Sequence, residues 1–396
     1  MNGSDRLPRR SGILLALLLG MASAAVAQDR PLGGSPFRGR ELLSEKLCTQ
    51  CHSVWGHGGH LAPDMSTAVA GKSWLALVGD FWNHTPRMID AMGGRGHSWP
   101  TLDRDEMADL LSYLYYLRLF DKVGDAARGA ITYSQHKCSN CHSLGGSGGK
   151  HASPLDHLSA YPSSMVLAQS MWNAGREMQR DQLGQGTAIP TFLSSEMADL
   201  QAYIRANGLR HDVRVELLPL PDPARGEQVF RSKRCRACHQ PDGVGPDLAS
   251  AARGRTVSEI AGILWNHSYA MSDRMASAGI PFPLFEGTEM ADLISHLYFR
   301  SFLGGRGNVR RGSAVFTEKA CAECHGETSE AAADLAGSEV LSDPTALSAA
   351  MWNHAPAMHT LMAERAVAWP KFELGEMEDL AAYLQSIAKP RGAGGR

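Results

Sequence analysis

The string CTQCH at Cys48–His52 decides how the rest of this sequence is interpreted, because the pattern C-x-x-C-H recurs three more times. The other copies begin at Cys138, Cys235 and Cys321, so the first cysteines of successive copies are 90, 97 and 86 residues apart. The four copies account for all 8 cysteines of the 396-residue chain. A motif that returns at such intervals indicates a tandem repeat of one small structural unit.

Each copy is flanked by the same features in the same order. An Arg-Gly pair precedes it, and a Trp-Asn pair, an apolar residue followed by Pro, and a segment beginning Glu-Met come after it. The Arg-Gly pairs are Arg38-Gly39, Arg128-Gly129, Arg225-Gly226 and Arg311-Gly312. The Trp residues are Trp82, Trp172, Trp265 and Trp352, and the apolar–Pro pairs are Trp99-Pro100, Ile189-Pro190, Phe282-Pro283 and Trp369-Pro370.

The last segment of each repeat has the pattern of an amphipathic helix. In EMADLLSYL, residues 106–114, the apolar residues Met107, Leu110, Leu111 and Leu114 follow the helical period. No stretch shows sustained strand alternation. We therefore predict an all-α protein of four tandem small helical domains, named units 1 to 4, over residues 36–122, 123–216, 217–305 and 306–390. The Pro-rich run Leu217–Pro223 predicts an extended linker between the two halves.

The N-terminal residues have the three parts of a secretory signal. Arg6, Arg9 and Arg10 form a basic region, residues 13–25 are apolar, and Ala25-Val26-Ala27 forms a small-residue cleavage site. We expect residues 1–27 to be removed and the mature chain to be exported, for example to the periplasm, without a membrane span. An uncleaved N-terminal anchor is the alternative. The net charge of −2 argues against a nucleic-acid partner.

The chemistry of C-x-x-C-H is covalent haem attachment. The two thiols can form thioethers to a haem, and the adjacent His then ligates the iron. A zinc ribbon would need its cysteine pairs much closer together, a thiol-redox motif sits in a βαβ setting, and a disulfide needs no His. Four copies therefore predict four covalently bound haem c groups. The predicted attachment residues are Cys48, Cys51, Cys138, Cys141, Cys235, Cys238, Cys321 and Cys324, and the predicted proximal iron ligands are His52, His142, His239 and His325.

The second axial ligand has three repeating candidates, all placed after the Trp. A Met six residues after the Trp is present in every unit, so we predict ligation by Met88, Met178, Met271 and Met358. A His two residues after the Trp, and a Met ten residues after it, are each absent from unit 2, which has Ala174 and Gln182 there. The alternative for the Met series is plain core packing, since Met often fills gaps in cores. We expect the His series to pack or hydrogen-bond near the haem, and the Trp series to pack in the haem pocket.

With these motifs in place, each unit resembles a class I c-type cytochrome domain. The resemblance rests on C-x-x-C-H, the downstream Met and the final E-M-A-D-L helix, and is fullest in unit 3, where Val244–Leu248 reads VGPDL. It implies a helical fold in which the first and last helices cross beside the haem. It also implies maturation by a cytochrome c assembly machinery in the periplasm. Unit 2 departs most from the pattern.

We therefore predict an exported tetrahaem c-type cytochrome that transfers electrons between other redox proteins or respiratory complexes, rather than an enzyme. Protein ligands on both sides of each iron favour electron transfer over chemistry at an open site. A haem enzyme with an open distal site in one domain is the alternative from another class, and unit 2 is where we would expect it. A cytochrome subunit of a larger respiratory complex or filament is a third interpretation.

Overall fold

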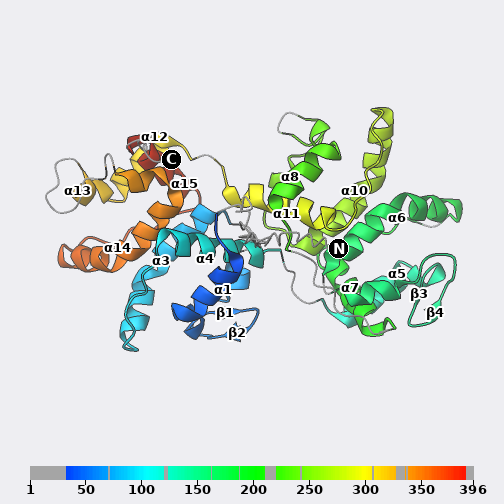
Figure 1. The fold of residues 1–396 in the computed structure, drawn as a ribbon, viewed down its shortest axis with the longest axis horizontal. Coiled ribbons are helices and arrows are strands. Elements are labelled where there is room, and N and C mark those ends of the chain that lie inside the picture. The colour runs from blue at the N-terminus through cyan, green and yellow to red at the C-terminus, as the bar shows by residue number, and fades with distance from the viewer. Residues whose placement is uncertain are drawn as a thin grey trace, which may run out of the picture.

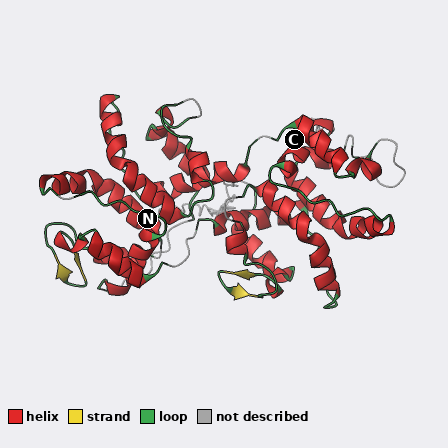
Figure 2. Ribbon diagram, turned by 180° about the vertical axis from the view of Figure 1, so that it is seen from behind, coloured by secondary structure: helices red, strands yellow, loops and turns green. Residues whose placement is uncertain are grey.

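A computed structural model describes residues 33–69, 72–119, 124–161, 163–186, 188–209, 220–240, 243–305, 307–326, 335 and 338–388. The predicted signal peptide and residues 217–219 of the predicted linker lie outside this part of the chain. The described residues are mostly helical, and their strands form two small hairpins (Figure 2). The all-α prediction is confirmed.

One order of elements recurs in the four units. The first helices are α1 (Pro36–Glu45), α5 (Ala126–Gln135), α8 (Pro223–Ser232) and α12 (Val309–Glu318). Long helices follow the C-x-x-C-H motifs, namely α3 (Trp74–Gly93), α6 (Ser164–Gly184), α10 (Val257–Ser277) and α14 (Pro344–Glu364). The last helices are α4 (Arg104–Leu117), α7 (Glu196–Asn207), α11 (Glu289–Leu303) and α15 (Glu376–Ile387).

Short elements lie between the first and the long helices. The C-x-x-C-H motifs form η1 (Cys48–Gln50), η2 (Cys138–Asn140), η4 (Cys235–Ala237) and α13 (Cys321–His325). Hairpins follow in units 1 and 2, made of β1 (Ser53–Val54) with β2 (His57–Gly58) and β3 (Ser143–Leu144) with β4 (Ser147–Gly148). The remaining short pieces are α2 (Met65–Ala68), η3 (Leu155–Ala160), α9 (Leu248–Ala252) and η5 (Glu339–Ser342).

The first and last helices of each unit cross at the glycine of the Arg-Gly pair. A Cβ on Gly129 would lie 2.0 Å from the main-chain oxygen of Asp199, so only glycine allows this approach. The same close contact joins Gly39 to Asp109, Gly226 to Asp292 and Gly312 to Asp379. The crossing that the family resemblance implied is therefore present in all four units.

The aspartate at this crossing also ties the two helices together. The Asp199 carboxylate accepts a hydrogen bond from the main-chain N–H of Asp125, the N-cap of α5, at 2.7 Å. Arg128 donates to both oxygens of the same carboxylate, each at 2.9 Å. Units 3 and 4 repeat the ion pair with Arg225–Asp292 and Arg311–Asp379, which explains the Arg of the Arg-Gly pair. In unit 1, Arg38 instead pairs with Glu41 and Glu45.

The units associate as unit 1 with unit 4 and unit 2 with unit 3. Figure 1 shows α1, α3 and α4 in the same half of the molecule as α12 to α15, and α5 to α7 in the other half with α8, α10 and α11. The two halves meet where the Tyr115 hydroxyl of α4 donates to the main-chain oxygen of Ser295 in α11, at 2.7 Å. Units that are adjacent in the sequence are therefore not always paired in space.

Each pair is held by the Trp-Asn motif of one unit and the apolar–Pro loop of the other. The Trp82 indole donates to the oxygen of Pro370 at 2.9 Å, and the Asn83 side chain forms two hydrogen bonds with the main chain of Phe372, at 2.8 and 2.7 Å. Trp352 and Asn353 make the reciprocal bonds to Pro100 and Leu102. The other pair repeats the arrangement with Trp172 to Pro283 and Trp265 to Pro190.

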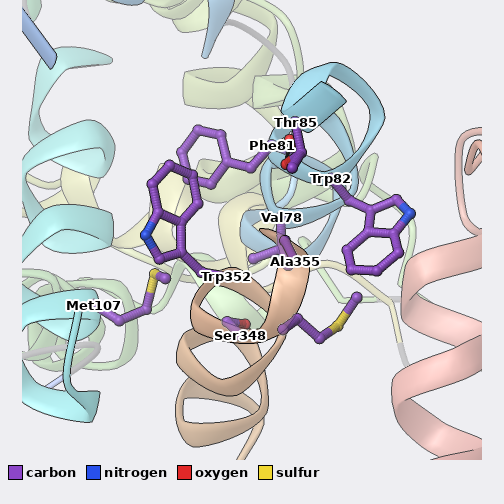
Figure 3. Close-up of a pocket in the computed structure, with 9 residues that line it drawn as sticks. Val78, Phe81, Trp82, Thr85, Met107, Ser348, Trp352 and Ala355 are labelled. Carbon is purple, nitrogen blue, oxygen red and sulfur yellow. Dashed lines mark hydrogen bonds between the residues drawn. The ribbon is translucent and has the colours of Figure 1, made fainter. Parts of the chain in front are cut away.

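The Trp82 indole of unit 1 is buried at this contact, and the Trp352 indole of unit 4 is half-buried. Figure 3 shows Trp82 and Trp352 on opposite sides of the crossing of α3 and α14, around a small cavity lined also by Val78, Phe81 and Met107. Trp82 stacks on Trp369 of unit 4 with ring centroids 4.2 Å apart. The expectation that the Trp series packs in haem pockets is corrected, since these side chains join one unit to another.

Candidate haem sites

The residue before each C-x-x-C-H motif has a left-handed backbone conformation. Leu47, Lys137, Arg234 and Ala320 have φ values of 65°, 55°, 62° and 61°. Non-glycine residues rarely adopt this conformation, which costs of order 1–3 kcal/mol and concentrates at functional sites. The same unfavourable φ angle occurs at the same position of all four repeats. This recurrence indicates that the turn has a functional role.

The motif itself forms one tight helical turn. In unit 1 the oxygen of Cys48 accepts hydrogen bonds from the N–H groups of Cys51 and His52, at 3.2 and 2.9 Å. Units 2 and 3 repeat both bonds with the same lengths, and unit 4 continues the turn as the short helix α13. Each motif thus places its two cysteines and its histidine on one helical turn.

The eight cysteines are all free thiols, and each is partly buried. Burial raises the pKa of the first cysteine of every motif, Cys48, Cys138, Cys235 and Cys321, to about 11. Redox-active cysteines have lowered pKa values, so these thiols lack the activation that a thiol–disulfide enzyme needs. Cys48, Cys235 and Cys321 lie against the larger hydrophobic core, and Cys138 lies against the smaller one.

In units 1 to 3 the predicted proximal histidine is held by the carbonyl of a following residue. The Nδ1 atom of His52 lies 2.9 Å from the oxygen of Pro63, that of His142 lies 2.8 Å from Ser153, and that of His239 lies 3.0 Å from Pro246. A carbonyl can only accept, so Nδ1 carries the proton and the lone pair resides on Nε2. Metal-ligating histidines are oriented in this way. The donor set therefore fits a covalently attached haem.

The four predicted distal methionines occupy equivalent places on the long helices. Met88, Met178, Met271 and Met358 are half-buried, on α3, α6, α10 and α14. Met178 packs against the smaller core, and Met271 and Met358 pack against the larger one. In unit 4, Arg365, just after α14, donates to the Cys324 sulfur at 3.6 Å, so the end of this helix lies beside its own attachment motif.

The histidines two residues after the Trp differ among the units. His84 is half-buried, and its ring centroid lies 6.3 Å from that of His52 with the ring planes at 65°. Burial lowers the pKa of His84. His267 and His354, at the same position in units 3 and 4, are exposed. The repeat in the sequence gives no sign of this difference.

An aspartate in the loop that follows organises the C-x-x-C-H region of units 1 and 2. Asp64 accepts hydrogen bonds from the N–H of Gly56 at 2.7 Å and from the Ser53 hydroxyl at 2.8 Å. Although burial opposes its charge, these bonds and those from Ser66 lower the pKa of Asp64. Asp156 accepts from the N–H of Gly145 at 3.0 Å in the same way. Asp334, which follows the motif of unit 4, lies outside the described residues.

Comparison with known proteins supports this chemistry. Residues 37–118 and 309–388 match the family model Cytochrome c, and residues 221–279 match the model Cytochrome C oxidase, cbb3-type, subunit III. These ranges lie in units 1, 4 and 3. No curated protein and no solved structure matches the chain. The chain therefore contains cytochrome c domains, which implies covalently bound haem c and haem-based electron transfer. Within the described part of the chain, no helix has both the length and the hydropathy to cross a membrane.

Proposed function

We propose that the protein is an exported tetrahaem c-type cytochrome that passes electrons between redox partners in the periplasm or an equivalent compartment. The observation that carries this proposal is the fourfold recurrence of one turn, with a left-handed residue before two partly buried thiols and an adjacent His. Haem supplies reversible one-electron chemistry, and covalent attachment prevents its loss.

The protein's part is to hold and tune the cofactor. The Nδ1 hydrogen bonds of His52, His142 and His239 would hold the imidazoles in the tautomer that ligates the iron of a bound haem. On the opposite side we propose the thioethers of Met178, Met271 and Met358 in units 2 to 4. In unit 1, both Met88 and His84 are candidates for the distal iron ligand. A thioether ligand raises the reduction potential, and ligation from both sides leaves no open position for substrate.

Mass spectrometry and haem quantification of the exported protein test the proposal. We expect four haem groups per chain, and three after replacement of both Cys138 and Cys141 by Ala. Replacing His57, an exposed His outside the motifs, with Ala is the control and is expected to leave four. A mature chain with fewer than four haem groups, or with disulfides between motif cysteines, contradicts the proposal.

A haem enzyme is the second candidate, and unit 2 is the place for it. Unit 2 has Ala174 and Gln182 where unit 3 has His267 and Met275. Gln179, one residue after Met178, is buried and donates to the Ser268 hydroxyl of unit 3 at 2.8 Å, so this side of α6 faces the neighbouring unit. Binding of about one equivalent of carbon monoxide by the reduced protein favours the enzyme; no binding favours the carrier.

The partners are proposed to be other redox proteins or a respiratory complex. The match of residues 221–279 to a cbb3-type oxidase subunit model supports a respiratory setting. A subunit of a larger complex or a filament would co-purify as a large assembly. A free carrier is expected to elute in size-exclusion chromatography as a monomer or small oligomer.

A further inference from the structure

The rings of His52 and His84 are spaced as two ligands of one metal ion would be. A metal–imidazole bond is about 2 Å long and the ring centre lies about 1 Å beyond the nitrogen, so imidazoles on opposite sides of one ion have centres about 6 Å apart. The observed separation is 6.3 Å. Rings on opposite sides of one ion can take any mutual twist about the axis, so the interplanar angle of 65° is compatible with this arrangement.

Both imidazoles are also in the tautomer that ligation needs. The Nδ1 atom of His52 is bonded to the oxygen of Pro63, and the Nδ1 atom of His84 is bonded to the oxygen of Asp80 one turn earlier in α3. Each carbonyl requires a proton on Nδ1, which leaves the lone pair of Nε2 available. An edge contact between two aromatic rings can occur at the same distance, but it does not require this tautomer in both rings.

The environment of His84 sets it apart from its equivalents. His84 is half-buried, whereas His267 of unit 3 and His354 of unit 4 are exposed. Met88 follows His84 by four residues, so it lies on the same face of α3 but about 6 Å further along the axis. One iron can accept only one of the two side chains.

We propose that His84, not Met88, is the distal ligand of the haem attached at Cys48 and Cys51, which makes unit 1 a bis-histidine site. This inference rests on the proposed function and deepens it. Bis-histidine ligation lowers the reduction potential relative to His/Met ligation. The four haem groups are then unequal, and the haem of unit 1 is the most difficult to reduce if units 2 to 4 have Met ligands.

Near-infrared magnetic circular dichroism of the oxidised holoprotein tests the ligand directly, since imidazole–imidazole and imidazole–thioether haem groups have separate bands. We expect one bis-imidazole haem in four. The His84→Ala variant should lose that signal, while Met88→Ala should leave the spectrum unchanged. His267→Ala is the matched control, expected to have no effect.

The opposite pattern overturns the inference: loss of one thioether signal in Met88→Ala with no ligand change in His84→Ala. Haem content and far-ultraviolet circular dichroism of each variant show whether it has folded and carries its cofactor. If His84→Ala misfolds, the wild-type spectrum still decides, because a protein without any bis-imidazole signal excludes His84. Failure of the proposed function would instead appear as missing haem in the wild-type protein.

Discussion

The indole N–H of Trp369 donates to the main-chain oxygen of Trp82 at 3.0 Å, and this oxygen is the one that Pro86 leaves without a helical partner. Pro has no N–H, so the carbonyl four residues before it in a helix loses its normal bond. The reciprocal contact exists in the other direction: Trp99 donates to the oxygen of Trp352, four residues before Pro356. Pro86 and Pro356, the prolines inside α3 and α14, are thus each matched by a tryptophan of the other unit.

The first prediction concerns this match. Trp369→Phe removes the N–H and leaves the Trp82 oxygen unsatisfied, which should lower the free energy of unfolding by about 1–3 kcal/mol. In a Pro86→Ala background the helix regains its own N–H donor, so the same substitution should cost less. Denaturant unfolding of the two single variants and the double variant measures the coupling. Additive effects would show that the Trp82 oxygen is satisfied without either partner.

The helix crossing gives a second prediction. Gly129→Ala would place a methyl group 2.0 Å from the Asp199 oxygen, and relief of this overlap requires the two helices to separate. We expect a loss of about 1–3 kcal/mol, as for other overpacked sites, seen as a lower midpoint of thermal unfolding. The control is Gly184→Ala at the end of α6, where nothing lies within 4 Å and alanine favours the helix. An unchanged midpoint for Gly129→Ala would contradict the close contact between α5 and α7 at this glycine.

Acid sensitivity provides a third prediction. Although burial opposes the charge, hydrogen bonds from Arg128, the Asp125 N–H and Ser195 lower the pKa of Asp199. A depressed folded-state pKa adds stability that is fully present above the unfolded-state pKa of about 4 and is lost as the pH falls through the folded value. Asp199→Asn should therefore lower stability at pH 7 and flatten its decline below pH 4. Substitution of the exposed Asp90 by Asn serves as the control. If the stability of Asp199→Asn declined below pH 4 with an unchanged slope, the lowered pKa of Asp199 would be refuted.

The fourth prediction concerns cofactor and folding. The first cysteine of every motif lies against a hydrophobic core, so an attached haem would extend those cores. Units of fewer than 100 residues bury little apolar surface by themselves. We expect a variant with all eight cysteines changed to alanine to show much weaker far-ultraviolet circular dichroism than the holoprotein. Native-like helicity in that haem-free chain would show that the helices hold together without the cofactor.

Local features of this protein were predictable because they depend on neighbouring residues. The apolar stripe of residues 106–114 predicted α4, which runs from Arg104 to Leu117. The pairing of units 1 and 4 was not predicted, since it joins residues such as Trp82 and Pro370 that are far apart in the sequence. A signal was nevertheless present: only units 1 and 4 combine Pro four residues after the Trp with Trp before the loop Pro.

The candidate distal ligands show a second limit of prediction from the sequence. The repeat treats His84, His267 and His354 as equivalent, yet the structure buries the first more than the others. Their burial depends on how each long helix lies against its own motif and its partner unit, which spacing alone cannot express. The Trp series illustrates the same point, because an indole that packs on a haem and one that packs on a neighbouring unit have the same pattern in a sequence.

The pairing of units 1 with 4 and 2 with 3 has a consequence for biosynthesis. Units 2 and 3 are contiguous, so their contact can form while the chain is still emerging from the ribosome. Unit 1, although made first, must wait for the last segment of the chain before Trp82 and Trp99 find their partners. Contacts between such distant residues close a long loop and form slowly. The contact between unit 1 and unit 4 is therefore expected to form only after the whole chain has been made.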